Sequence, residues 1–265
     1  KPLLFDPFLS MWDTAVGDRK LYAPKSDKAW GIQALDWVAL HSADGVLADT
    51  PAMADFYAMI SGLPKQRFTV VPVGADEAVF MPVPEAPEAD EVLFYGRMIP
   101  LHGVATIVEA ARRLPEVSFH LVGEGQVDVD SLMADLPNVR RTRSLPYAEL
   151  PGAIARAALC LGIFSGGDKA KRVVPHKVYE AAAMGKAILT ADTPAIREAF
   201  PEGALALVPA ADPEALAEAI RSLLADPEAR RRLGAHAQAR FEEAFSTRAI
   251  GEALYEAASK LGVRP

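Results

Sequence analysis

Short apolar runs alternate with helix-like patterns along most of this chain. After the run Val92–Tyr95, apolar residues recur at intervals of three and four, which places them on one face of a helix: Val104, Ile107, Val108, Ala111 and Leu114. The next apolar run, Val117–Val122, has the length of a strand. Strands that alternate with helices in this way predict βαβ units and a parallel sheet.

The pattern after residue 90 predicts a complete doubly wound α/β domain. We expect six strands joined by helices: Val92–Tyr95, Val117–Val122, Val139–Arg143, Ala158–Phe164, Ala187–Thr190 and Ala204–Val208. Asp212-Pro213-Glu214 combines a capping residue, a proline at the first helical position and an acid in the first turn, so a helix begins there. Two more helices are expected at about Asp226–Phe245 and Ser246–Leu261.

The segment before residue 80 contains fewer elements. We expect three strands there, at Leu3–Phe5, Gly45–Leu47 and Phe68–Val71, and a helix over Pro51–Ile60. An earlier helix would carry five residues on one face: Trp30, Ala34, Trp37, Val38 and His41. These elements are too few for an independent doubly wound domain of ~150 residues. We therefore expect the C-terminal part of a domain whose first strands are absent.

A proline-rich acidic stretch, Met81–Asp90, interrupts the pattern and predicts a linker. It divides the chain into a partial N-terminal domain at 1–84 and a C-terminal domain at 85–245. A final helix at 246–265 is expected to pack back on the N-terminal domain.

Composition narrows the function classes. The 265 residues carry a net charge of −7, so we expect no nucleic acid partner. One cysteine, Cys160, excludes an internal disulfide and a cysteine-based zinc site, and no spacing resembles a metal cluster. The sequence contains no apolar run of the ~20 residues that a membrane span needs. We expect a cytoplasmic protein, with peripheral contact at the inner face of the membrane left open.

Candidate chemistry lies where the strands end, because open parallel sheets bind ligands beyond the carboxyl ends of their strands. Gly96 and Arg97 follow the first strand of the C-terminal domain and offer close backbone approach and a phosphate-binding fork, with His102 before the next helix. Gly123-Glu124-Gly125 follows the second strand. Taken singly, these features are also typical of a loop with a solvated arginine and an ordinary turn.

The stretch after the fourth strand is more informative. Ser165–Arg172 is a short loop of glycines and basic residues, and it leads to a helix that starts near Pro175. Lys177 and Glu180 lie three residues apart near the start of that helix, and so share a face. A cation beside free helix N–H groups suits a diphosphate, and a carboxylate one turn further suits a ribose diol. The alternative is an exposed, charged helix start.

Several spaced motifs resemble one family. Phe94–Gly103 resembles the "GRL-x-P-x-KG" segment of retaining glycosyltransferases of family 4, which have the GT-B fold. Val122–Gly125 is similar to their "VG-x-G" turn, and Lys177–Lys186 to their "E-A-x-A-x-G-K-P" helix. The turn Pro72–Asp76 and the late helix starts at Asp212 and Asp226 also match. The resemblance implies two Rossmann-like domains, the N-terminal one incomplete here and facing the acceptor.

The resemblance also implies roles for individual residues. Arg97 would hold the diphosphate of a UDP- or GDP-sugar, and Glu180 the ribose hydroxyls. The remaining expected contacts to the donor come from Gly96, Gly123, Leu145 (in a segment along the base), Lys177 and Val178. No metal or other cofactor is expected, because basic residues and a helix start neutralise the leaving diphosphate. The acceptor would be a glycan, a lipid-linked group or a small molecule.

Two positions depart from the family pattern. His102 stands where the family usually has lysine, and a protonated imidazole there would lose its charge as pH rises. Arg172 stands where the family has the first glutamate of a pair that ends at Glu180. Asp168 is a candidate to replace that glutamate, and Asp6 is a candidate contact to the acceptor or donor sugar.

Together these observations predict a retaining hexosyltransferase that uses a nucleoside diphosphate sugar. Three alternatives stay open: a non-catalytic nucleotide-sugar-binding module, a GT-B sugar-nucleotide epimerase, and an unrelated flavodoxin-like binding domain.

Overall fold

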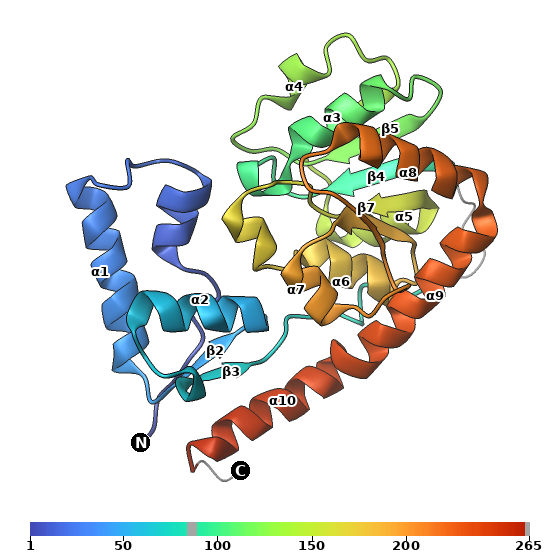
Figure 1. Ribbon diagram of the computed structural model, residues 1–265. Coiled ribbons are helices and arrows are strands. Elements are labelled where there is room, and N and C mark those ends of the chain that lie inside the picture. The colour runs from blue at the N-terminus through green and yellow to red at the C-terminus, as the bar shows by residue number, and fades with distance from the viewer. Residues whose placement is uncertain (84–88, 263–265) are drawn as a thin grey trace.

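The structure is a computed structural model that describes residues 1–83 and 89–262, and its strands form two parallel sheets (Figure 1). The larger sheet has the order β6-β5-β4-β7-β8-β9. Its strands in chain order are β4 (Ala89–Tyr95), β5 (Ser118–Val122), β6 (Val139–Thr142), β7 (Ala157–Leu161), β8 (Ile188–Ala191) and β9 (Ala206–Val208). The six strands expected after residue 90 are all present. The predicted domain boundary at 84/85 and the middle of the predicted linker lie outside the described residues.

The larger sheet lies between two layers of helices (Figure 1). Val92 and Phe94 of β4 pack with α3 (Val104–Arg112) and α8 (Pro213–Ala225). Leu93 and Tyr95 point to the other face and pack with α5 (Leu150–Arg156), α6 (His176–Ala183) and α9 (Pro227–Ala244). Because successive strand residues alternate faces, a continuous apolar run is needed to fill both cores.

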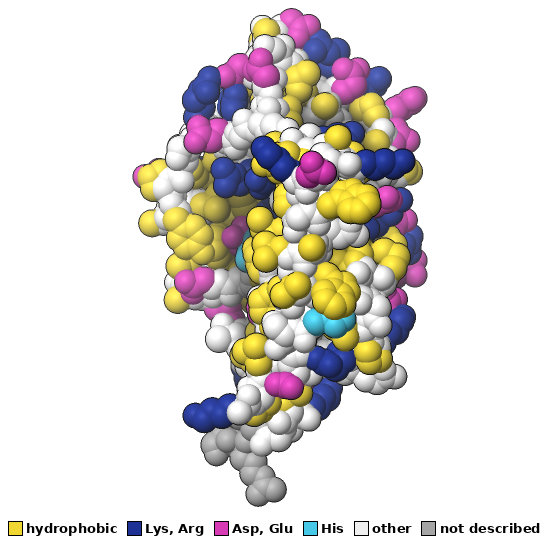
Figure 2. Space-filling model, turned by 90° about the vertical axis from the view of Figure 1, so that its left-hand side faces the viewer, with side chains coloured by type: hydrophobic (Ala, Val, Ile, Leu, Met, Phe, Trp, Pro, Cys, Tyr) yellow, Lys and Arg dark blue, Asp and Glu magenta, His cyan; other side chains and the backbone are white. Residues whose placement is uncertain are grey.

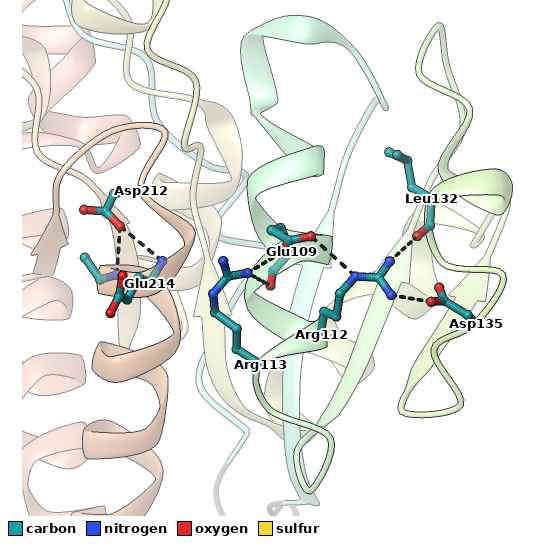
Figure 3. A network of polar contacts seen from close by, with 8 residues as sticks. Glu109, Arg112, Arg113, Leu132, Asp135, Asp212 and Glu214 are labelled. Atoms are coloured by element: carbon teal, nitrogen blue, oxygen red, sulfur yellow. Dashed lines mark hydrogen bonds and ion pairs between the residues drawn. The ribbon is translucent and has the colours of Figure 1, made fainter.

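The start of α8 confirms the predicted cap. The Asp212 carboxylate accepts hydrogen bonds from the backbone N–H groups of Glu214 (3.1 Å) and Ala215 (2.9 Å) (Figure 3). Figure 3 also shows Arg112, near the end of α3, reaching Asp135 and the Leu132 carbonyl. This contact ties α3 to the short helix α4 (Val129–Leu132) and the loop after it.

The smaller sheet pairs β1 (Leu4–Phe5), β2 (Gly45–Ala48) and β3 (Phe68–Val70) in sequential order. The helix α2 (Pro51–Ser61) and the end of α1 (Asp27–Ser42) cover it, with a core that includes Leu40, Val46, Met53, Tyr57 and Phe68. The three expected strands and two expected helices are present in the described residues 1–83.

The apolar face expected on α1 is not part of a core in this structure. The side chains of Trp30, Trp37 and Val38 are 66%, 48% and 56% exposed, whereas Ala29 and Leu40 are the buried positions of this helix. Hydrophobic side chains accordingly gather on the side of the molecule that carries α1 (Figure 2). The periodicity located the helix correctly but did not identify which side packs.

Short helical turns complete the described residues. They are a π-helical turn at Asp13–Asp18, α7 (Pro194–Ala199) and 3₁₀ turns at Lys65–Arg67, Pro100–His102, Tyr147–Glu149 and Asp168–Lys171. The last helix, α10 (Thr247–Lys260), runs from the larger sheet toward the smaller one (Figure 1), where a Cβ atom added to Gly45 would lie 3.1 Å from the Leu261 side chain. In the described part of the chain, no helix has both the length and the apolar character needed to cross a membrane.

Candidate functional site

A cavity of about 670 Å³ lies between the segments before and after residue 84. It is at the carboxyl ends of β4 and β5, beside the point where the strand order reverses from β4 to β7. Such a reversal leaves a crevice between the connections that leave the sheet in opposite directions, and ligands of doubly wound folds bind there. The sequence motifs therefore meet at the place where the topology predicts a ligand.

Two glycine turns form the floor of this cavity. Gly96 and Gly123 both have φ of +132°, a region that favours glycine. A Cβ atom on Gly123 would lie 2.0 Å from the Gly96 carbonyl oxygen, so the two strand ends approach more closely than a side chain permits. Both glycines line the cavity, so backbone without a side chain faces a ligand where β4 and β5 end.

Arg97 follows the first of these turns and is exposed at the cavity. Its guanidinium has no hydrogen bond or ion pair with any described residue. A guanidinium without a partner can donate its planar set of N–H groups to an anion without first breaking another interaction.

Lys177 supplies a second cation from the first turn of α6. Its side chain is buried, and Nζ lies 4.0 Å from the Phe94 ring centroid and 3.5 Å from Nδ1 of His102. Burial lowers the pKa of Lys177 to about 7, and the negative charge of Glu180 partly offsets that effect. A diphosphate in the cavity would favour the charged form.

His102 corrects the expectation of a protonated imidazole. Burial and the neighbouring Lys177 lower the pKa of His102 to about 3. Its Nδ1 makes a short contact to the Arg97 carbonyl oxygen, which is an acceptor, so Nδ1 carries the proton of a neutral ring. His102 therefore holds the Arg97 loop by a hydrogen bond and adds no charge of its own at neutral pH.

Glu180 lies one helical turn beyond Lys177 and also lines the cavity. Burial raises the pKa of Glu180, while a hydrogen bond with Tyr95 and the charge of Lys177 lower it. The Tyr95 hydroxyl also reaches the Lys177 carbonyl at 3.0 Å. Glu180 therefore has acceptor capacity for a ligand at the cavity wall, because the Tyr95 proton is donated to the Lys177 carbonyl.

Of the other predicted site residues, some line the same cavity and some do not. Leu145 lines the cavity together with Ser144 and Tyr147. The Val178 side chain, on α6, is buried in the core, and its backbone N–H donates a hydrogen bond to the Pro175 carbonyl. Asp168 is 80% exposed, pairs with Lys171 at 2.8 Å and is not among the lining residues.

Asp6, the last predicted site residue, is exposed and lines a smaller neighbouring cavity. The structure thus brings together Gly96, Arg97, His102, Gly123, Leu145, Lys177 and Glu180 in one cavity. Asp6, Asp168 and Val178 lie outside it.

The opposite wall contains residues of the N-terminal segment that the sequence analysis missed: Phe8, Leu9, Thr14, Asp18, Arg19 and Asp49. Lys169, from the predicted basic loop after β7, also lines the cavity. Lys169 Nζ bonds the Thr14 hydroxyl at 2.6 Å and so joins these two segments. Asp49 directly follows β2, so the search of strand ends would have found it had the smaller sheet been included. Phe8, with φ of +54°, carried no sequence signal.

Arg172 does not face the cavity as the glutamate of the family pattern would. Its guanidinium pairs with Asp13 at 2.7 Å and stacks over the Phe56 ring at 4.2 Å. Its backbone carbonyl also accepts the Thr50 hydroxyl at 2.5 Å. This position therefore joins the two segments and offers no carboxylate to a sugar. Among the described residues, no three His, Cys, Asp or Glu side chains cluster as a metal site.

The sequence profile of a glycosyl transferase-like family matches residues 102–256, more than half of the chain. The chain belongs to this family. The matched region starts at His102 and includes Gly123, Leu145, Lys177 and Glu180.

Two known proteins are similar to this chain, one in sequence and one in structure. The chain is 29% identical over 256 residues to alpha-maltose-1-phosphate synthase of Mycolicibacterium smegmatis, a match that covers 85% of this chain and 66% of that protein. Sucrose-phosphate synthase from Thermosynechococcus elongatus superposes with a TM-score of 0.75 at 23% identity, over 90% of this chain and 64% of that one. The chain thus spans slightly less than two thirds of the length of either protein.

Anabaena HepE, solved in complex with UDP-glucose, gives a TM-score of 0.76 at 18% identity, over 99% of this chain and 72% of that one. These structural neighbours are GT-B glycosyltransferases, which confirms the predicted fold class.

Proposed function

We propose that this chain is a retaining, family 4 glycosyltransferase that takes its sugar from a nucleoside diphosphate sugar. One observation carries the proposal. The Arg97 guanidinium without a partner among the described residues, the buried Lys177 and the half-buried Glu180 line a single cavity, at the point where the strand order of a GT-B fold reverses. Family membership and the UDP-glucose complex of Anabaena HepE support the choice of ligand.

In the proposed complex, Arg97 and Lys177 bind the diphosphate and Glu180 accepts hydrogen bonds from the ribose hydroxyls. As the bond between the anomeric carbon and the phosphate oxygen breaks, negative charge grows on the leaving diphosphate. The two cations and the start of α6 stabilise that charge more than they stabilise the ground state, which lowers the barrier. The proposal needs no metal ion for this step.

Calorimetric titration with UDP, GDP and ADP tests the binding part. We expect one nucleotide to bind, and Arg97→Ala and Glu180→Ala each to weaken it by a few kcal/mol, since each removes a charge-assisted contact. Arg221→Ala and Glu218→Ala are matched controls, because these residues form an exposed pair with each other on α8. Equal affinity for the site variants and the unmodified chain would reject the assignment.

Product analysis tests the chemistry. NMR of the product formed from the matching nucleotide sugar should show retained anomeric configuration.

A second candidate is a nucleotide-sugar-binding module without turnover. The pairing of Arg172 with Asp13 favours it, because the glutamate expected at this position is replaced and its replacement is engaged elsewhere. Nucleotide binding that Arg97→Ala weakens, with no sugar transfer to any acceptor and no epimerised donor, would identify this function.

A further inference from the structure

A second chamber, of about 330 Å³, adjoins the main cavity. Phe8, Asp49 and Val73 line both spaces and so stand between them. Most of the remaining wall is apolar and comes from the ends of β2 and β3 and from α10: Leu47, Ala48, Val71, Pro72, Ile250 and Leu254. A space this apolar favours a hydrocarbon group.

Two polar groups at this chamber lack partners. The Tyr57 side chain is 1% exposed, and its hydroxyl has no hydrogen-bond partner among the described residues. Oδ1 of Asp49 is likewise buried without a partner. Buried polar groups are almost always paired, because leaving one unpaired forfeits its interaction with water. These two groups are therefore available to polar atoms of a ligand in the chamber.

The pairing rules select the chemistry of that ligand. Burial raises the pKa of Asp49 to about 6, so the carboxylate is charged and purely an acceptor at neutral pH. Tyr57 can donate its proton but has no acceptor. An alcohol group satisfies both sides, because it donates to a carboxylate and accepts from a phenol. An ammonium group has no lone pair and would leave the Tyr57 proton unpaired.

We propose that the chamber between β2, β3 and α10 binds the acceptor, and that this acceptor is an amphipathic alcohol. Its hydrocarbon part packs against Leu47, Ile250 and Leu254, and its hydroxyl groups bond Asp49 and Tyr57. Because Asp49 also lines the main cavity, the hydroxyl that it holds lies beside the sugar of a bound donor. The word acceptor rests on the proposed function; the alcohol site does not.

NMR titration of the full chain with hexan-1-ol tests the site, with hexylamine and glucose as comparison probes. We expect hexan-1-ol to bind more tightly than either comparison. Asp49→Asn should weaken its binding about tenfold and Tyr57→Phe about threefold. Leu254→Trp should fill the chamber and abolish binding, whereas Leu132→Trp, at a similarly exposed apolar position on α4, should not.

Thermal unfolding provides a second measurement. Tyr57→Phe should raise the melting temperature of the ligand-free protein, because the change removes an unpaired hydroxyl and keeps the ring. A lower melting temperature would show that the hydroxyl is already paired and would contradict the proposal.

Three results of the titration would overturn the alcohol site. The first is that hexan-1-ol does not bind. The second is that the Asp49→Asn and Tyr57→Phe variants bind it as tightly as the unmodified chain does. The third is that hexylamine binds more tightly than hexan-1-ol. UDP, GDP and ADP are titrated into the same samples to separate the two proposals. If none of the three binds the unmodified chain, the proposed function and the acceptor role are overturned, while the alcohol site is decided by hexan-1-ol alone.

Discussion

The Arg172 guanidinium lies 2.7 Å from the Asp13 carboxylate and joins the loop after β7 to the π-helical turn of the N-terminal segment. Both side chains are largely buried, at 17% and 6% exposed. Removing one partner of such a pair leaves a buried charge without compensation, which costs more than the pair itself contributes.

We therefore expect Arg172→Met to lower the free energy of unfolding by about 3 kcal/mol. Urea denaturation measures this change. The double variant Arg172→Met with Asp13→Asn should lose less than the sum of the two single variants, because neither charge is then left alone. Strict additivity of the two losses would show that the pair is not coupled.

Lys177 should make stability rise with pH. Its pKa is about 7 in the folded chain, against an ordinary value of about 10.4 in the unfolded chain. Between these values the unfolded state holds a proton that the folded state lacks, so the free energy of unfolding increases as pH rises. Denaturation at pH 7, 8, 9 and 10 measures the slope.

Lys177→Met should flatten this slope, since the group that titrates has gone. Lys171→Met serves as the control, because Lys171 is an exposed lysine that pairs with Asp168. An unchanged slope in the Lys177 variant would mean that the ammonium keeps its ordinary pKa.

His102 should stay neutral through the whole physiological range. Its folded pKa of about 3 lies below the ordinary value of about 6.5, so stability falls as pH drops from 6.5 toward 3. NMR titration of the His102 imidazole should show no protonation above pH 5. UDP affinity, if UDP is the ligand, should therefore not follow the charge of His102.

Gly123→Ala should destabilise the fold by roughly 3 kcal/mol, because the added methyl group meets the Gly96 carbonyl and strains a positive φ. Gly31→Ala, in the middle of α1 with open space around it, is the matched control. It should stabilise the chain by about 0.5–1 kcal/mol, because alanine favours a helix more than glycine does. Thermal or urea unfolding distinguishes the two, and a well-tolerated Gly123→Ala would contradict the close approach of the strand ends.

The sequence by itself determined the strands and the chemistry at their ends. Continuous apolar runs such as Val92–Tyr95 indicate buried parallel strands, because a strand has apolar side chains on both faces only where both faces of its sheet are covered. Two glycines, two basic residues and a carboxylate that follow those strands were predicted as site residues: Gly96, Gly123, Arg97, Lys177 and Glu180. These signals are local, so no knowledge of distant contacts was required.

Tertiary structure decided what depends on partners far away in the sequence. Burial against Lys177, which is 75 residues distant, makes His102 neutral, and the pairing with Asp13, 159 residues away, turns Arg172 from the cavity. The exposed face of α1 has the same cause, because periodicity shows which side chains share a face of a helix and not which face packs on a core. The cavity wall that contains Asp49 and Lys169 forms only where the segments before and after residue 84 meet. The cavity, and the pKa values of the residues buried in it, depend on both segments and cannot be predicted from either one alone.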